Sequence, residues 1–354
     1  MNKCIYLKGI EPQLTFNSGE HIIPAGIGGI MKLPNGIVSD QVNTKVFSPL
    51  ELDFMRNSII SLPRQFDGPG KRGSFVPEKA SKSNIHIMVS NDDGSLNLGY
   101  IKLAKPYLIP QVRVCPSESV HIIFDKTEGA PNLQIKQLTK NMQEFDGKYQ
   151  EINDDRISVD DFLLGTDNDR WYLAKNPNRE ITNLLEIVDK IINSVDSENI
   201  EPGFQSSQMT SHQSMAFNIE SYFRVCAKIV FNFLALSKGQ DFVLKEEFDL
   251  IRGWILNGGE NEFVQLMDKE GKPEFLEQIP FPHLSHKILI TESKDKLFGI
   301  ISFYGANFEA VVKLAENITL NDFVLDGFIC DWKNKKEYRL VEFISSLGGS
   351  SDFA

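Results

Sequence analysis

One segment in the C-terminal half of the chain restricts the fold more than any other. Residues 216–236 are almost all apolar, and the spacing of their side chains predicts a helix. Polar residues recur every four positions along it and would form one stripe: Glu220, Arg224, Lys228 and Asn232. Because a helix that is apolar on its other sides is normally buried, this stripe is expected to face water, a buried polar network or a ligand.

The segments after this helix predict a helical hairpin and an antiparallel sheet. A second helix is expected over residues 246–256, where Asn257-Gly258-Gly259 would end it. Three β-rich runs then predict an antiparallel meander; they are residues 286–290, 297–304 and 310–314. His283 and His286 have no cysteine or acidic residue at ligand spacing, so we expect them to be structural. The sequence contains no Walker loop, dinucleotide fingerprint or Gly-x-Ser-x-Gly elbow.

The middle of the chain differs in composition from both ends. Short β-rich runs predict strands at residues 84–89, 107–109, 112–114 and 120–124. Residues 132–215 are acidic and irregular, apart from a helical pattern over residues 181–192, and the polar stretch 194–212 is the best linker. We therefore expect an α+β protein in three parts, residues 1–75, 76–195 and 196–354.

The composition is that of an ordinary globular protein. Of 354 residues, 41% are hydrophobic and 24% are charged, and no apolar run is long enough to span a bilayer. The N-terminal residues lack the basic-then-apolar pattern of a secretory signal, and the four widely spaced cysteines offer no disulfide framework. We therefore expect a cytoplasmic protein that does not contact a membrane.

The net charge of −11 is unevenly distributed along the chain. Residues 1–82 contain ten lysines and arginines against seven acidic residues, a balance of +3, so the rest of the chain carries −14. Four basic residues cluster around the Asp67-Gly68-Pro69-Gly70 turn: Arg56, Arg64, Lys71 and Arg72. These side chains either contact the phosphates of a nucleic acid or belong to a merely solvated loop.

A short motif in this basic part carries the candidate catalytic residues. Glu20-His21-Ile22-Ile23-Pro24, followed by Gly28-Gly29, predicts a short strand that ends in a turn. A returning strand is expected at residues 36–38, and a helix from Pro49 to about residue 62, because proline suits a first helical turn. Asparagines stand at positions 35 and 43, before this helix. The expected order is strand, strand, helix.

This arrangement resembles the HNH endonucleases, the ββα-metal nuclease family. The resemblance covers about the first 75 residues firmly and the helical hairpin loosely. It implies an N-terminal ββα-metal HNH module, followed by a larger α+β region with antiparallel strands and the helical hairpin. The catalytic set that it implies is His21, Asn35 and Asn43. His21 would activate water, Asn35 would orient His21, and Glu20 and Asn43 would bind one divalent metal ion.

The residue types suit hydrolysis of a phosphodiester bond. Histidine, with an unperturbed pKa of about 6.5, can take a proton from water near neutral pH. A divalent cation can stabilise the charge that develops on the phosphate and on the leaving oxygen. Carboxylate and amide oxygens favour Mg²⁺ or Mn²⁺ over softer metals, and one ion per site would suffice. Glu51 and Asp53 either supply a further metal oxygen or serve the N-terminal turn of the helix.

The sequence departs from the family at a structural zinc site. Many members hold zinc with two Cys-x-x-Cys pairs, and the corresponding residues here are Cys4-Ile5-Tyr6-Leu7 and Ser39-Asp40-Gln41-Val42. A single cysteine cannot build a four-coordinate zinc site, so no structural zinc is expected. Our hypothesis is that Leu7 and Val42 pack as an apolar mini-core in its place.

The resemblance thus implies a divalent-metal-dependent endonuclease, with DNA favoured over RNA as the substrate. The C-terminal region would select the substrate, regulate the activity, or bind a protein partner or further copies of the chain. A regulated effector of bacterial anti-phage defence suits this organisation. The alternatives are a catalytically silent nucleic-acid-binding module and a regulatory subunit of a defence complex.

Overall fold

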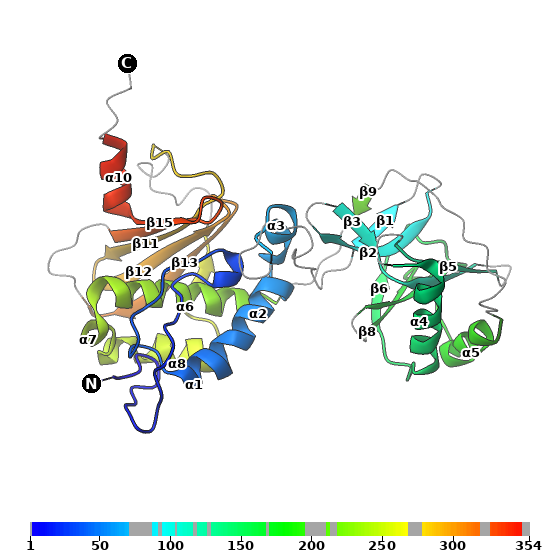
Figure 1. Cartoon of the computed structure of the whole chain (residues 1–354), viewed down its shortest axis with the longest axis horizontal. Helices are drawn as coiled ribbons and strands as arrows, with labels where there is room; N and C mark the ends of the chain where they lie inside the picture. The colour runs from blue at the N-terminus through cyan, green and yellow to red at the C-terminus, as the bar shows by residue number, and fades with distance from the viewer. Residues whose placement is uncertain are drawn as a thin grey trace, which may run out of the picture. The chain divides into compact units, whose positions relative to one another are not determined.

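The computed structural model describes residues 2–70, 87–90, 94–102, 105–115, 119–125, 129–167, 170–194, 210–212, 218–267, 278–318 and 326–348. The chain divides into two compact units (Figure 1). The first unit combines Met1–Ser81 with Ala216–Ala354, and the second is Lys82–Met215. The N-terminal and C-terminal parts, which the sequence predicted as separate domains, therefore belong to one unit.

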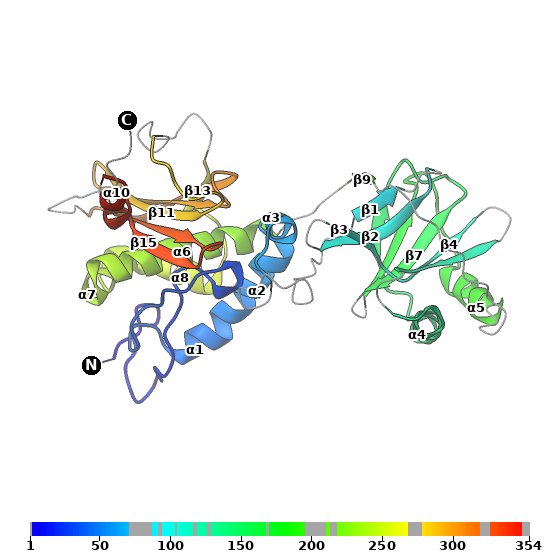
Figure 2. The same ribbon diagram turned by 45° about the horizontal axis from the view of Figure 1, so that its top comes forward.

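The first unit is built around the long apolar helix, which is α6 (Ile219–Lys238). This helix packs against a six-stranded sheet and against α2 (Ser48–Asn57) and α8 (Asp249–Asn257), as both ribbon views show (Figures 1 and 2). Its apolar side chains share one hydrophobic cluster with residues from both ends of the chain, such as Ile22 and Phe328. Burial of this common apolar surface explains why the two parts form a single unit.

The sheet of the first unit is antiparallel throughout, with the strand order β10-β13-β12-β11-β14-β15. Its strands are β10 (Val264–Leu266), β11 (His286–Ser293), β12 (Lys296–Phe303), β13 (Phe308–Glu316), β14 (Asp326–Asp331) and β15 (Lys336–Arg339). Strands β11 to β13 confirm the predicted meander. The remaining elements of this half are α7 (Gln240–Val243), η6 (Glu246–Phe248) and α10 (Leu340–Gly348).

The N-terminal part begins with turns and one short hairpin. His21 and Lys32 form an antiparallel bridge around a 3-10 turn, η1 (Ala25–Ile27). The returning strand was expected at residues 36–38, and this prediction is wrong. The carbonyls of residues 36 and 37 accept hydrogen bonds from the amides of residues 3 and 5, at 3.1 and 2.9 Å. The backbone of this segment is therefore paired with the N-terminal turn and not with the His21 strand.

The helix predicted from Pro49 is present as α2, but further helical turns precede it from Asp40 onwards. The elements of this helical run are α1 (Asp40–Val42), a π turn η2 (Asn43–Phe47), α2 and, after a break at residue 58, α3 (Ser61–Phe66). In the π turn, Ser48 N donates to Asn43 O. This wider turn shifts the hydrogen-bond pattern just before Pro49, which has no amide hydrogen to donate.

The second unit contains two sheets and two helices. The sheets have the strand orders β3-β2-β1-β9 and β5-β4-β7-β8-β6. The strands of the first sheet are β1 (Ile87–Ser90), β2 (Leu96–Lys102), β3 (Lys105–Leu108) and β9 (Thr210–His212). Those of the second are β4 (Gln111–Val114), β5 (Val120–Ile123), β6 (Gln150–Asn153), β7 (Phe162–Asp167) and β8 (Arg170–Lys175). Helices α4 (Pro131–Gln143) and α5 (Leu184–Ser194) cover this second sheet through a shared hydrophobic cluster.

Residues 132–215 are more regular than the sequence suggested. They supply β6 to β9, most of α4 and all of α5. Strand β7 is buried along its whole length, so it lacks the apolar-polar alternation that reveals a half-exposed strand. Strands β3, β4 and β5 confirm the predictions for residues 105–124. Residues 84–86, which include His86, and most of the predicted linker lie outside the described residues.

His121 is exposed on β5. Within the described part of the chain, no helix has the length and apolar character needed to cross a bilayer.

Candidate functional site

The main chain of His21 is held from the far half of the sequence. Lys228 Nζ and Asn232 Nδ2 on α6 both donate to the His21 carbonyl, at 3.2 and 3.1 Å. Asn232 Oδ1 accepts a hydrogen bond from the Tyr6 hydroxyl at 2.7 Å. Lys228, Asn232 and Tyr6 are all buried. Half of the polar stripe on α6 thus faces a buried polar network, which is one of the three possibilities that the sequence left open.

Lys228 also pairs with two carboxylates. Its ammonium contacts Glu20, which is 4% exposed, and lies 2.5 Å from Glu51 Oε1. The Phe47 ring lies on another side, with its centroid 5.2 Å from Nζ. Burial disfavours the charged ammonium, but the two carboxylates outweigh this effect and raise the pKa of Lys228 above its ordinary value. The buried lysine is therefore charged at neutral pH.

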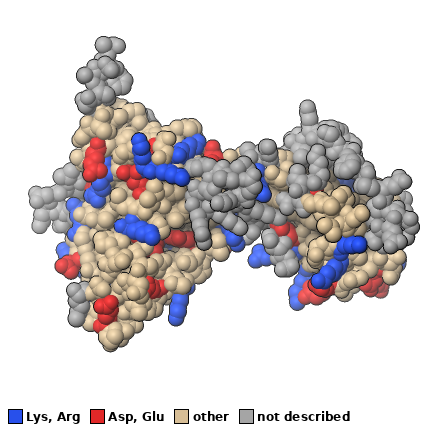
Figure 3. Space-filling model, viewed as in Figure 1, with Lys and Arg blue, Asp and Glu red and all other residues tan. Residues whose placement is uncertain are grey.

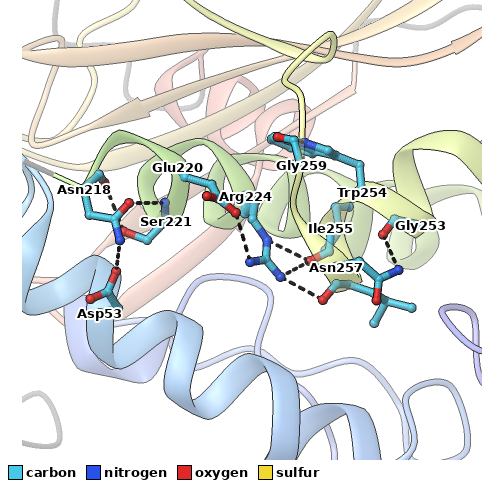
Figure 4. Close-up of polar contacts among 11 residues, drawn as sticks. Asp53, Asn218, Glu220, Ser221, Arg224, Gly253, Trp254, Ile255, Asn257 and Gly259 are labelled. Carbon is cyan, nitrogen blue, oxygen red and sulfur yellow. Dashed lines mark hydrogen bonds and ion pairs between the residues drawn. The ribbon is translucent and has the colours of Figure 1, made fainter.

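The other half of the stripe joins helices. Figure 4 shows that Arg224 reaches the end of α8, where its Nη2 donates to the carbonyls of Ile255 and Leu256 at 2.9 and 2.8 Å. Glu220 lies one turn before Arg224, at 3.4 Å from its guanidinium. The last carbonyls of a helix have no partner within it, so a cation at this end is favourable.

Asp53 joins α2 to the start of α6. Its Oδ2 accepts from Asn218 Nδ2 at 2.7 Å, and Asn218 Oδ1 caps α6 by accepting from Ser221 N at 3.2 Å (Figure 4). Asp53 Oδ1 accepts from Asn57 at 2.5 Å. Of the two acidic residues considered as extra metal ligands, Asp53 thus has a structural role, whereas Glu51 faces Lys228.

Two residues on one face of the helical run from Asp40 to Asn57 contact this cluster. Asn43, Phe47 and Glu51 are spaced four residues apart, which places them on one side of a helix. Phe47 and Glu51 both contact Lys228. Asn43 Nδ2 donates to Ser18 Oγ at 3.4 Å, and Ser18 lies just before Glu20 in the sequence. The helix therefore brings Asn43 to the segment that carries Glu20 and His21.

The His21 ring is half-buried and makes no hydrogen bond with the described residues. Burial, together with the charges of Lys32 and Lys228, lowers the pKa of His21 to about 4. The imidazole is therefore neutral at pH 7 and has a free lone pair with which it can accept a proton.

Asn35 is exposed and lies beside the start of the motif. A Cβ placed at Gly19 would come 3.1 Å from Asn35 Oδ1. No hydrogen bond joins Asn35 to His21 among the residues that the structure describes. The orienting role that the resemblance assigns to Asn35 stays a prediction.

The oxygen donors near His21 fit a hard divalent cation. Mg²⁺ is commonly held by one or two carboxylates and keeps several waters, so Glu20 and the Asn43 amide are suitable ligands. In the described ranges, no three His, Cys, Asp or Glu side chains come together as a metal cluster. A metal ion here would therefore rely on the amide of Asn43 and on water as well as on Glu20.

The four basic residues expected to bind nucleic acid have different surroundings. Arg56 is exposed on α2, whereas Arg64 is 6% exposed and donates from Nε to Gly26 O at 2.9 Å. Arg64 thus supports the turn next to His21. Lys71 and Arg72 lie outside the described residues. On the face drawn in Figure 3, the described lysines and arginines stand among acidic residues.

The two turns that correspond to the zinc-binding pairs lie next to each other. Ser39 N lies 3.5 Å from Cys4 Sγ, and Val42 is 1% exposed. Leu7, however, is 47% exposed, so the hypothesis of a Leu7–Val42 mini-core is wrong for Leu7.

Polar side chains from the C-terminal half hold these turns instead. Arg252 on α8 donates from Nε to Ile5 O at 2.5 Å, and Gln240 on α7 donates to the carbonyls of Lys3 and Gly36. Gln240 thereby bridges the segments that lead into the two turns. These hydrogen bonds connect both segments to the C-terminal half of the chain.

The turn after His21 is fixed in the same way. Glu337 on β15 accepts hydrogen bonds from Ile30 N and Met31 N, at 2.9 and 2.5 Å. His286 Nδ1 accepts from Tyr304 N at 3.2 Å, so its Nε2 carries the hydrogen that is donated to Ile27 O at 3.0 Å. The prediction that His286 is structural is confirmed by these contacts.

His286 makes the stability of the protein sensitive to acid. It is completely buried, and burial lowers its pKa to about 4. Because the unfolded chain binds this proton near pH 6.5, the stabilising contribution is complete above that pH and is lost as the pH falls towards 4. Between pH 7 and pH 5, we expect the free energy of unfolding to fall by about 2 kcal/mol more in the wild type than in His286→Gln.

Urea denaturation at the two pH values measures this difference. The glutamine can still donate to Ile27 O but does not titrate, and His283→Gln, which alters an exposed histidine of the same unit, is the matched control. Equal pH dependence in the wild type and His286→Gln would contradict the prediction.

Several anchors of the site were not found from the sequence. Lys228 and Asn232 stood out as polar positions on an apolar helix, but nothing linked them to His21. Gln240, Arg252 and Glu337 gave no signal, because their partners are backbone groups more than 200 residues away.

Comparisons of this chain with protein-family models, with curated proteins and with solved structures found no match.

Proposed function

We propose that this chain is an HNH-type endonuclease that hydrolyses phosphodiester bonds with Mg²⁺ or Mn²⁺, with DNA as the favoured substrate. The single observation that carries the proposal is the placement of His21. Two buried side chains of α6 donate hydrogen bonds to its main-chain carbonyl. Its neutral ring makes no hydrogen bond with the described residues. A fixed backbone and an unengaged imidazole suit a general base, while the lowered pKa makes this imidazole a weaker base than a free histidine.

The surroundings of His21 support the same chemistry. The His21–Lys32 bridge is followed by a helical run that begins at Asp40, and Glu51 in this run shares the Lys228 ammonium with Glu20. A bridged turn before a helix is one part of the ββα order that the resemblance implies. Glu20 and Asn43 would hold the divalent ion. Burial raises the pKa of Glu20, and the ammonium of Lys228 partly opposes this rise.

The residues of the chain would act as follows. The neutral His21 imidazole accepts a proton from a water molecule while the water oxygen forms a bond to phosphorus. The bond from phosphorus to the leaving nucleoside oxygen breaks with its electron pair. The divalent ion supplies charge stabilisation to the phosphate and to the leaving oxygen. Arg56, which is exposed on α2, is placed to contact the phosphate backbone.

Incubation of the full chain with plasmid DNA, single-stranded DNA and RNA tests the proposal. Each substrate is combined with Mg²⁺, Mn²⁺ or EDTA, and the products are separated by gel electrophoresis. We expect cleavage of DNA with either metal and none with EDTA. Asn43→Ala should weaken cleavage, whereas Asn257→Ala, which alters an exposed asparagine at the end of α8, should not.

One observation favours a second candidate function. Glu20 is almost completely buried and already pairs with an ammonium, which is also how a carboxylate with a purely structural role would appear. The chain would then be a catalytically silent nucleic-acid-binding or regulatory subunit of a bacterial defence complex. Binding of DNA without turnover under every metal condition would select this reading over the nuclease.

A further inference from the structure

The environment of Lys228 resembles that of a bound cation. The ammonium carries three hydrogens, and the structure provides three oxygen partners, from Glu20, Glu51 and the His21 carbonyl. The side chain is 0% exposed, so it cannot touch a substrate. Its partners come from the hairpin and from the following helix, which makes Lys228 the point where these elements meet α6.

The charges of this cluster do not balance. Two carboxylates surround one ammonium, which leaves one excess negative charge. Without the ammonium, Glu20 and Glu51 would face each other across the space that Nζ now fills. Two converging carboxylates with a nearby carbonyl oxygen are the donor set that hard divalent cations prefer.

We propose that Lys228 is the built-in cation of the site, and that it occupies the position between Glu20 and Glu51 that a divalent ion would otherwise take. The inference rests on the proposed function, since it assumes a metal ion held by Glu20 and Asn43. It assigns Lys228 and Glu51 as positioning residues. The chain then needs one exchangeable divalent ion, because the second positive charge belongs to the protein itself.

Variants that change the charge of the cluster can distinguish this role from ordinary structural support. Lys228→Met keeps the length of the side chain but removes the positive charge, so Glu20 and Glu51 must take up either a cation or a proton in its place. The double variant Lys228→Met/Glu51→Gln restores the wild-type charge. If Lys228 were merely a structural support, Lys228→Met would loosen the site and weaken metal binding, and the second change would not repair it.

Mn²⁺ titration followed by electron paramagnetic resonance, without nucleic acid, measures the effect on the full chain. We expect Lys228→Met to bind Mn²⁺ at least roughly tenfold more tightly than the wild type, or to bind one ion more, because the attraction of an extra charge on a divalent ion is large near the protein. The double variant should return to the wild-type affinity. Unchanged or weaker binding by folded Lys228→Met would overturn the proposal.

A second single variant covers the case in which Lys228→Met does not fold. Glu51→Gln removes one carboxylate and leaves the Lys228–Glu20 pair, so Mn²⁺ should bind more weakly than in the wild type. Asp53→Asn is the control on the same helix, and its affinity should be unchanged because Asp53 faces Asn218 and Asn57. Wild-type affinity in Glu51→Gln would overturn the proposal.

The binding assay and the cleavage assay can fail separately. If the chain cuts no nucleic acid but shows the expected order of Mn²⁺ affinities, the proposed nuclease function is wrong and the role of Lys228 as the built-in cation stands. If the wild type cleaves with metal but Lys228→Met does not bind Mn²⁺ more tightly, only the proposed role of Lys228 is refuted.

Discussion

Replacement of His21 by alanine is expected to lower the rate of metal-dependent cleavage by about 10²- to 10⁴-fold, the usual contribution of a positioned general base. The fold should persist, because Lys228 and Asn232 hold the carbonyl of residue 21, which alanine also has. The half-buried ring contributes only a small part of the core. Single-turnover cleavage at saturating enzyme measures the loss.

The controls for His21→Ala separate a lost base from a damaged site. Circular dichroism and DNA-binding affinity should match the wild type within error. His283→Ala removes an exposed histidine from the same unit and should cleave normally. Wild-type cleavage by His21→Ala would refute the assignment of His21, and loss in both variants would point to a less specific defect.

Of the variants proposed for stability measurements, Arg252→Ala should lower the free energy of unfolding the most. The guanidinium is 3% exposed and donates to the buried carbonyls of Ile5 and Val243, both at 2.5 Å, and it also pairs with Asp249. Hydrogen bonds from a charged donor contribute about 1.5–3 kcal/mol each, and both carbonyls would lose their partner. We expect the free energy of unfolding to fall by roughly 3 kcal/mol, and the Tm by about 6–12 °C.

Arg56→Ala is the matched control, because Arg56 is an exposed arginine of the same unit. Its free energy of unfolding should change by less than about 0.5 kcal/mol. Because Arg252 orders the turn of residues 4–7, the buried Cys4 thiol should also react faster with a maleimide in Arg252→Ala. A stability equal to that of the wild type would show that the Arg252 contacts are not needed to order the turn.

The sequence predicted those parts of the fold that depend on local patterns. The apolar faces of α6 predicted its burial, and the alternation in β11 to β13 predicted the meander. The Glu20-His21 segment and its glycine turn predicted a chain reversal, which the structure has as an isolated His21–Lys32 bridge around a 3-10 turn. Each of these signals lies within about 20 neighbouring residues, the range over which side-chain periodicity acts.

The rest depends on contacts between distant segments. The segment that returns to Glu20–Ile22 is Met31–Leu33, whereas residues 36 and 37 pair with the N-terminal turn, which no local pattern reveals. The helix began at Asp40 because a π turn compensates for Pro49. The most important contact that the sequence did not predict is the ion pair between Lys228 and Glu20, because the two residues are far apart in the chain. A polar residue on an apolar helix indicates that it has a buried partner, but the sequence does not show which residue this partner is.

The interrupted course of the first unit has a consequence for synthesis. A ribosome makes Glu20 and His21 early, then the entire second unit, and only afterwards α6 with Lys228 and Asn232. Domains generally fold as they emerge, but this unit must wait for its second half. Nascent and prematurely terminated chains therefore carry the motif without its buried support. The supported conformation of Glu20 and His21 is therefore reached only after translation has passed α6.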